Sequence, residues 1–399
     1  MFALLLGLAA GGAHAADAPQ SAREQVGKPV QQAQQLLRQK KYPEALVRLK
    51  EADAVPDKSP YETYVIEETR AVAAIDSGDD EAAMKALEAV LATRVLPPPE
   101  ASKRLASIVQ LDYQLKDYPR TVAAAQRYYK DGGSDPAPRR LMAQAYYLSD
   151  DFTNAAKTIR DVLADDERTG KPPDETLLLT LAGSAFKSKD DDGYIDALKR
   201  LAVSHPKHEY WADLVRAVGR KPGFAPRLRL DLDRLAVAAG AFDTPDQFVE
   251  AAQLALEAGF PGDARAFLDE GNAAGILGKG PAADRQERLA EMAKHQSDAD
   301  AAQLDAQAKE AEASGNGTAL EKLGEAYSSY GRHDDAIAAL TSSIKKGGLK
   351  NPDDARLHLG VTYLRAGRRA SAKDLLGAAS GGDGTKDLAQ LWLIQGGVE

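Results

Sequence analysis

One short pattern occurs twice near the end of the chain, 36 residues apart, and it constrains the fold more than any other feature. The pattern consists of a Leu-Gly pair, a Tyr three residues after the Gly, a second Gly, and then an Ala and a Leu. The first copy is Leu323, Gly324, Tyr327, Gly331, Ala336 and Leu340, and the second is Leu359, Gly360, Tyr363, Gly367, Ala372 and Leu376. A period of this length is typical of repeat proteins, in which each copy is one supersecondary unit.

Each repeated position has a mechanical role in a hairpin of two antiparallel helices. The small Gly of the first helix and the Ala of the second let the two helices approach closely. The Gly between them adopts the conformation that ends the first helix. Tyr and Leu fill the space between one hairpin and the next. Because a single hairpin cannot bury its apolar faces, the pattern predicts a stack of hairpins.

This pattern resembles the tetratricopeptide repeat (TPR), lengthened from 34 to 36 residues in the connecting loop. The resemblance is strong over residues 317–379, fair over residues 100–204, and a matter of spacing elsewhere. The small residue of the second helix recurs, with substitutions, at Ala45, Ala83, Thr121, Ala155, Tyr194, Ala264, Ala336 and Ala372. The two longest gaps each leave room for one degenerate unit. The resemblance implies an all-α, TPR-like α-solenoid, a right-handed superhelix of about ten hairpins.

Helix-breaking residues agree with this division. Proline clusters such as Pro97–Pro99 fall between the expected hairpins, where a helix must stop or start. The alternation typical of strands is absent, so no sheet is expected. Residues 275–283 are the best candidate hinge, and residues 384–395 are expected to form a capping helix. We therefore divide the chain into a signal peptide (1–15), an N-terminal and middle array (16–275), and a C-terminal array with its capping helix (276–399).

The N-terminus has the pattern of a secretory signal. An apolar run from Phe2 to Ala10 precedes Ala13-His14-Ala15, which has the small-x-small form of a cleavage site. The run is too short to span a bilayer. We therefore expect export and a mature protein in the periplasm that does not span the membrane.

Composition and motifs argue against catalysis. The chain has no cysteine, which excludes disulfides and thiolate chemistry, and its net charge of −9 argues against non-specific nucleic-acid binding. No phosphate-binding loop, nucleophile elbow or zinc-protease motif occurs. His205 and His208 form a close pair, but Pro206 separates them, and the Asp190–Asp192 run is expected to cap a helix. We expect no enzyme activity, no cofactor and no metal.

The expected partner-binding residues come from the geometry of such repeats. The first helix of each unit lines the concave groove at the second, fifth, ninth, twelfth and thirteenth positions of the repeat. Two neighbouring units place the following residues there: Gln110, Tyr113, Gln114, Arg140, Gln144 and Tyr147. Stacked amides and phenols suit an extended peptide or a glycan. The alternative is that Tyr113 and Tyr147 only fill space between helices.

A basic segment in the middle of the chain is a second candidate surface. Its arginines are predicted to form a docking patch for an anion or an acidic partner: Arg216, Arg220, Arg227 and Arg229, with Arg234 nearby. The alternative is a helix surface paired with Asp213, Asp231 and Asp233. The stretches His208–Trp211 and Arg220–Phe224 resemble envelope TPR proteins that accompany TonB-type energy-transducing systems.

Three functions remain open at this level. The TPR resemblance implies a non-catalytic periplasmic scaffold that binds a protein or peptide partner in the groove, as an adaptor in an envelope complex. The alternative is a solute- or glycan-binding periplasmic protein whose superhelix closes into a pocket. A peptidoglycan-cleaving enzyme built on a helical superhelix would need a separate catalytic domain, and no segment outside the repeats is long enough for one.

Overall fold

The computed structural model describes residues 21–398, so the predicted signal peptide lies outside the described residues. Throughout residues 21–398 the secondary structure is helical, with no strand, which confirms the all-α prediction. The helices belong to two compact units, one ending at Val162 and one beginning at Leu163. The domain boundary predicted at residue 275 falls inside the second unit, in the loop after Ala273.

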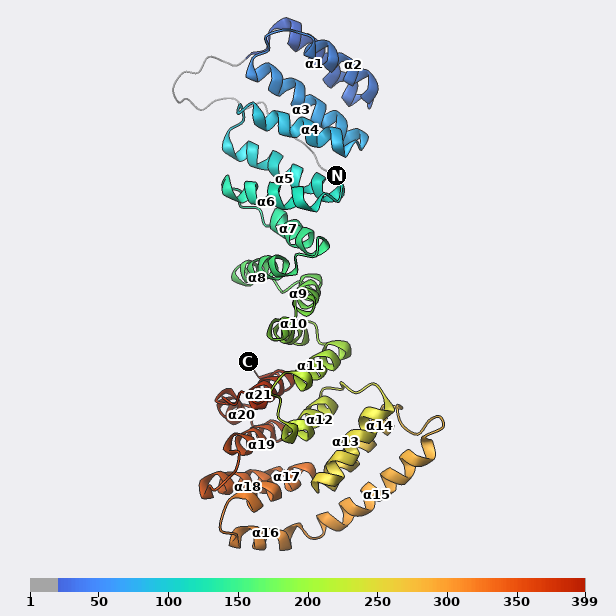
Figure 1. The fold of residues 1–399 in the computed structure, drawn as a ribbon, viewed down its shortest axis with the longest axis vertical. Helices are drawn as coiled ribbons and strands as arrows, with labels where there is room; N and C mark the ends of the chain where they lie inside the picture. The colour runs from blue at the N-terminus through green and yellow to red at the C-terminus, as the bar shows by residue number, and fades with distance from the viewer. Residues whose placement is uncertain (1–20, 399) are drawn as a thin grey trace. The chain divides into compact units, whose positions relative to one another are not determined.

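The first unit is a stack of helical hairpins (Figure 1). Helix α1 packs on α2, α3 on α4, and α5 on α6, and the first helices of successive hairpins also touch, as α5 and α7 do. Its helices are α1 (Glu24–Arg38), α2 (Tyr42–Asp53), α3 (Pro60–Ser77), α4 (Asp80–Ala92), α5 (Pro98–Gln114), α6 (Tyr118–Lys130), α7 (Ala137–Leu148) and α8 (Phe152–Arg168), the last of which contains the boundary between the units.

Aspartates in the turns between helices cap the second helices of several hairpins. The Asp79 carboxylate accepts a hydrogen bond from the Ala82 amide at 3.0 Å, and Asp117 caps α6 in the same way. Asp190 does the same at the start of α10, through the Gly193 amide at 2.9 Å. These aspartates satisfy amides that a helix N-terminus leaves without a partner. The prediction that Asp190 caps a helix is therefore confirmed.

The second unit continues the hairpin arrangement (Figure 1). Its helices are α9 (Glu175–Lys187), α10 (Asp191–Ser204), α11 (His208–Arg220), the 3-10 turn η1 (Pro226–Leu228), α12 (Arg229–Ala238), α13 (Pro245–Ala258), α14 (Pro261–Ala273), α15 (Ala283–Ala301), α16 (Leu304–Ala313), α17 (Thr318–Ser329), α18 (His333–Lys346), α19 (Pro352–Arg365), α20 (Arg369–Gly377) and α21 (Thr385–Gln395).

The repeated glycines lie where the two helices of a hairpin come closest. A Cβ atom added at Gly324 of α17 would lie 2.5 Å from Cγ of Leu340 on α18, and one at Gly360 of α19 would lie 2.5 Å from Cδ2 of Leu376 on α20. Both distances are shorter than any real contact. The same hairpins bury Ala336 and Ala372 completely. The duplicated pattern therefore makes the contacts expected from the sequence.

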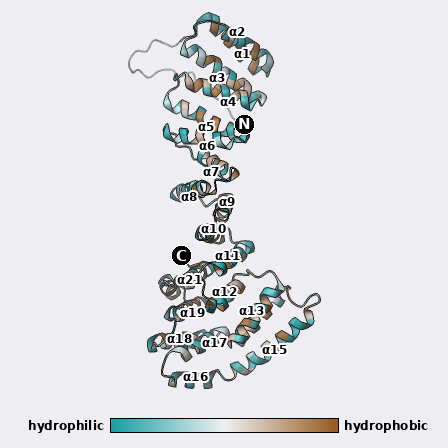
Figure 2. Cartoon of the chain, in the orientation of Figure 1, coloured by the Kyte–Doolittle hydropathy of each residue, from teal (hydrophilic) through white to brown (hydrophobic). Residues whose placement is uncertain are grey.

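The two degenerate units differ in how they pack. Helices α11 and α12 form a hairpin through η1. In contrast, α15 packs on α13 and α14, while α16 packs on α17. Figure 2 shows mainly hydrophilic residues on α15, whose buried positions include Gln286 and Ser297. The helices of this degenerate unit are therefore thinly packed.

Helix α21 has the bounds expected of the capping helix, and it does more than cover the last hairpin. It packs on α19 and α20, and also on α10 and α12 from the beginning of the unit. Lys221, in the loop after α11, forms an ion pair with Asp387 of α21 at 3.1 Å, and the Ala225 amide donates to the Asp383 carbonyl oxygen at 2.8 Å. The second unit is therefore closed on itself.

Candidate functional site

The six predicted groove residues lie on two helices that pack together in the first unit. Gln110, Tyr113 and Gln114 belong to α5, and Arg140, Gln144 and Tyr147 to α7. Gln114 is exposed and the other five are half-buried. Leu115, directly after α5, and Leu148, the last residue of α7, are 37% and 48% exposed. Gln and Tyr thus recur 34 residues apart on neighbouring helices, and an exposed Leu lies close to each pair.

Both tyrosines also pack on the helix that follows. The ring of Tyr113 lies 6.1 Å from that of Tyr118, and the ring of Tyr147 lies 5.5 Å from that of Phe152. Tyr118 and Phe152 are the first residues of α6 and α8. Each tyrosine therefore fills space between helices with one part of its ring and leaves another part accessible to solvent.

The predicted docking arginines separate into two places in the second unit. Arg216, Arg220 and Arg229 line a cavity of about 490 Å³ between α11, α12 and α13. Arg216 pairs with Asp213 at 2.6 Å, and Arg229 pairs with Asp233 at 3.2 Å. Burial raises the pKa of Asp233 to about 6. Two of the three arginines of this cavity thus have aspartate partners that the sequence offered.

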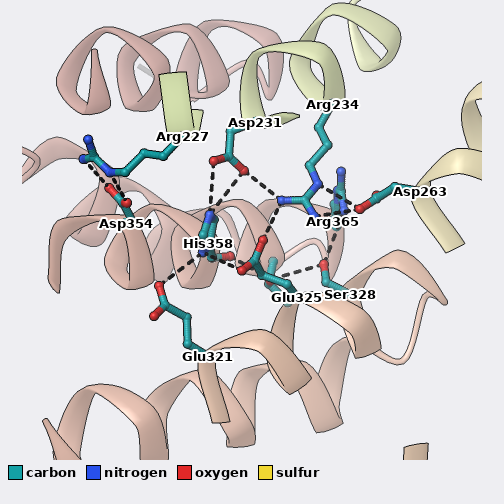
Figure 3. Close-up of polar contacts among 11 residues, drawn as sticks. Arg227, Asp231, Arg234, Asp263, Glu321, Glu325, Ser328, Asp354, His358 and Arg365 are labelled. Carbon is teal, nitrogen blue, oxygen red and sulfur yellow. Dashed lines mark hydrogen bonds and ion pairs between the residues drawn. The ribbon is translucent and has the colours of Figure 1, made fainter. Parts of the chain in front are cut away.

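Arg227 lines a different cavity, and its side chain reaches Asp354 of α19 (Figure 3). Its guanidinium binds both carboxylate oxygens of Asp354 on α19, at 2.7 and 3.0 Å, and also pairs with Asp383. This two-point geometry is the strongest form of Arg–carboxylate pair. Arg227 therefore serves the closure of the second unit.

Beside this ion pair lies a second cavity, of about 500 Å³, lined by α12, α13, α17 and α19. Apolar side chains, including Leu230, Leu254 and Phe260, form part of its wall. The rest is densely charged: Arg227, Asp231, Arg234, Glu321, Lys322, Glu325, Lys350, Asp354 and His358. We call this cavity the charged pocket.

Arg234 is the main cation of the charged pocket. Its side chain is only 7% exposed, and it binds Asp231 at 2.8 Å, Asp263 at 2.6 Å and Glu325 at 2.7 Å. These carboxylates come from α12, α14 and α17, so one guanidinium links three helices. A buried charge of this kind is tolerated only when it is paired and hydrogen-bonded.

His358 of α19 stands between three carboxylates (Figure 3). Its Nε2 atom lies 3.2 Å from an oxygen of Asp231, and its Nδ1 atom lies 3.6 Å from Glu321 and 3.5 Å from Glu325. Burial disfavours a charged imidazole, but the negative charges of Glu325 and Asp231 outweigh it and hold the pKa of His358 well above its ordinary value. Nδ1 is buried without a hydrogen-bond partner.

Other candidate ligands in the sequence do not converge. His205 Nε2 lies 2.9 Å from the Pro173 carbonyl oxygen, while His208 Nδ1 contacts the carbonyl oxygen of Gly240. The two histidines thus contact different parts of the backbone. Within residues 21–398, one group of three side chains could hold a metal ion, and it consists of Asp231, Glu325 and His358.

The charged pocket was missed by the sequence analysis, although a signal for it was present. Taking Ala336 as the marker, the repeat begins at Gly317, which puts Glu321 and Glu325 at its fifth and ninth positions. The following repeat puts Asp354 and Arg365 at its second and thirteenth positions. The ninth and thirteenth positions are the groove positions that gave Gln110 and Gln114. The same rule applied to the C-terminal repeats would have found them.

Comparison with known proteins gives little beyond the fold. No protein-family model and no curated protein matches the chain. Among solved structures, a TPR protein from Parabacteroides merdae is similar over 68% of this chain and all of its own, with 12% identity and a TM-score of 0.34. The Naa15/Naa10 complex bound to HypK-THB covers 89% of this chain and 58% of its own, with 18% identity and a TM-score of 0.33.

A third similar structure is the complex of the TPR2AB domain of yeast Sti1 with pHSP90. It covers 74% of this chain and 99% of its own, with 12% identity and a TM-score of 0.24. TM-scores this low carry no argument about function, so the class of the protein is taken from its own structure. That structure is an all-α solenoid of TPR-like hairpins whose second unit contains a charged pocket. Among the described helices, none is long and apolar enough to cross a membrane.

Proposed function

We propose that this protein is a non-catalytic adaptor of the cell envelope, which binds a protein partner along the row formed by α5 and α7. The observation that carries the proposal is the recurrence of Gln and Tyr at equivalent positions of two packed helices, with an exposed Leu at the C-terminal end of each. Tyrosine contributes a large contact area at a low cost in conformational entropy. A partner segment lying across both helices would meet the same chemistry twice.

Export to the periplasm is the cellular part of the proposal, and it rests on the sequence pattern of residues 1–15. The likeness of two short stretches to TPR proteins of TonB-type systems suggests the complex in which the adaptor acts. Fusion of residues 1–20 to a reporter that is active only after export tests the first point. An inactive fusion would remove the envelope from the proposal.

Partner binding is tested by capture from an envelope extract followed by isothermal titration with the captured protein. Changing Tyr113 and Tyr147 together to Ala should weaken binding by at least about 2 kcal/mol, as expected for anchor residues. The paired Phe substitutions keep the ring packing on the next helix and separate the loss of contact from loss of fold. Tyr146→Ala is the matched control, because the Tyr146 hydroxyl contacts Gln126 of α6.

The outcomes of this titration are distinct. Circular dichroism of each variant establishes that the helices remain formed. Undiminished affinity in the paired Ala variant, with the fold intact, would exclude the row on α5 and α7 as the binding surface. Equal losses in the paired Ala variant and in Tyr146→Ala would assign the effect to packing of α7.

One observation favours a second candidate function. The second unit is closed by α21 and contains a charged pocket of about 500 Å³, a volume in the range of small-molecule sites. This arrangement matches the alternative of a periplasmic protein that binds a small solute. Thermal shift measurements against a library of charged metabolites and glycans test it: a ligand that protects the second unit supports this candidate.

A further inference from the structure

The cavity of about 490 Å³ between α11, α12 and α13 combines an apolar wall with three arginines, Arg216, Arg220 and Arg229. We call it the arginine cavity. We infer that it binds an amphipathic organic anion, whose carboxylate or phosphate group is held by the arginines and whose hydrocarbon part lies against the apolar wall. The proposed adaptor function does not require this site.

The first argument is the arrangement of the three arginines. Arg216 and Arg220 are four residues apart on α11, so they lie on the same face of that helix. Between them is Gly219, and Nη1 of Arg229 lies 3.9 Å from the place that a Cβ atom would take at this glycine. The third guanidinium therefore lies against the turn of α11 that carries the other two arginines.

The second argument is the number of guanidinium N–H groups that remain available. Arg216 binds Asp213 through Nη1 at 2.6 Å, and Arg229 binds Asp233 through Nε at 3.2 Å. A guanidinium has several N–H donors, so each of these ion pairs leaves donors for a ligand. In the part of the chain that the structure describes, Arg220 is exposed and forms no ion pair. Arg220 is therefore the charge that a bound anion would neutralise.

The two carboxylates that line the cavity do not take this role. Asp233 is 4% exposed, and burial raises its pKa to about 6, so its negative charge competes weakly with an external anion for Arg229. Glu250 is exposed, so water screens its charge. It also lines a neighbouring cavity between α13 and α15, beside Arg285 and Arg288. Neither carboxylate thus neutralises the free arginine of α11.

The third argument is the apolar wall, which selects an amphipathic ligand. Leu232 of α12, Phe242 of the following loop, and Ala251 and Leu254 of α13 form much of it. A small anion such as inorganic phosphate would leave these side chains in contact with water. A hydrocarbon group bound there removes apolar surface from water, which is favourable. The volume of the cavity is in the range of small-molecule sites.

The arginine cavity differs from the charged pocket in the state of its arginines. In the charged pocket, Arg227 binds two carboxylates and Arg234 binds three, all from the chain itself. In the arginine cavity, Arg216 and Arg229 each bind one. An incoming carboxylate or phosphate group therefore finds more free donors in the arginine cavity, and charge-assisted bonds to such groups are strong.

The test is isothermal titration of the whole chain with octanoate, at concentrations below micelle formation. We expect a single site per chain. Acetate keeps the carboxylate and octanol keeps the hydrocarbon chain, so each should bind at least about 10-fold more weakly than octanoate, because each lacks one of the two kinds of contact. Octyl phosphate should bind as well, and its affinity relative to that of octanoate identifies the preferred headgroup.

Arg220→Gln is the most informative variant, because it removes a charge on which no ion pair of the described structure depends. It should weaken octanoate binding at least about 10-fold, the loss expected for one hydrogen bond to a charged group, and leave octanol binding unchanged. Arg369→Gln, at an exposed arginine of α20, is the matched control and should bind octanoate like the wild type. Circular dichroism and the emission of Trp211 and Trp392 check the fold.

Val215→Phe tests the apolar part of the site. Val215 lines the cavity and is half-buried, so a larger side chain there fills part of the space for the hydrocarbon chain. This variant should weaken binding of octanoate and octanol alike.

Two results would overturn the inference. One is failure of the wild-type chain to bind both octanoate and octyl phosphate. The other is octanoate binding that Arg220→Gln leaves unchanged, and a loss in Lys322→Gln instead would place the anion in the charged pocket. Neither result affects the proposed adaptor surface on α5 and α7, which titration with the captured protein partner tests separately.

Discussion

Replacing Arg234 by Met is the sharpest test of what holds the second unit together. The change keeps a long side chain but removes the charge that binds Asp231, Asp263 and Glu325, each within 2.8 Å. The three carboxylates would remain buried between α12, α14 and α17 without their common cation. The variant therefore measures the cost of unpaired buried charge rather than the loss of a surface contact.

The expected loss of stability follows from the burial of the Arg234 side chain. Removing one partner of a buried ion pair costs about 3–5 kcal/mol, because the remaining charge is left uncompensated. For a unit of this size, each kcal/mol lowers the unfolding midpoint by about 2–4 °C, so we expect a loss of about 10 °C. The loss should shrink toward about pH 4, where the freed carboxylates can take up protons.

The two tryptophans make the assay specific. Trp211 and Trp392 are the only tryptophans of the sequence, and both are buried in the second unit. Their fluorescence during thermal unfolding in EDTA therefore reports on that unit alone. Arg216→Met is the matched control, since this half-exposed pair with Asp213 contributes at most about 1 kcal/mol. Equal midpoints for the two variants would refute the assignment of Arg234 as the central cation.

Two further predictions concern packing and pH. Gly360→Leu should lower the free energy of unfolding by about 1–3 kcal/mol or more, because the new side chain would overpack against Leu376. Gly377→Leu is the control, since nothing lies within 4 Å of a Cβ atom there, and it should cost far less. Equal losses in melts followed by tryptophan fluorescence would contradict the close approach of the helices at Gly360. Burial raises the pKa of Asp112 to about 6, so the carboxyl weakens the first unit as pH rises from about 4 to 6. Asp112→Asn should therefore stabilise by about 2 kcal/mol at pH 8 and by little at pH 4 in circular dichroism melts, and equal effects at both would contradict this.

The sequence predicted the fold well because the information was local. The role of Gly324, the cap at Asp190 and the bounds of α21 each depend on a few neighbouring residues or on one repeat. The contacts that close the second unit were not predicted. Arg227 and Asp354 are 127 residues apart, and no periodicity brings them together. The charge of Arg227 was recognised, but its partner on the same chain was not.

The charged pocket shows a different limit. His358 occupies the sixth position of its repeat, which is not among the groove positions, and it carries no motif spacing to Asp231 or Glu325. Only the packing of α12, α17 and α19 brings these side chains together. The two glutamates of α17 were within reach of the repeat rule, whereas the histidine that joins them required the three-dimensional structure.

The contact of α21 with α10 has a mechanical consequence. The chain enters the second unit through α9 and α10 and leaves it through α21, and these entry and exit helices touch. In an open array of hairpins, tension applied at the two ends acts on every hairpin at once. Here tension between the two ends of the unit acts first on the contact of α10 with α21, including the Lys199–Asp387 ion pair. The hairpins between them, and the charged pocket that they form, remain unstretched until α21 detaches.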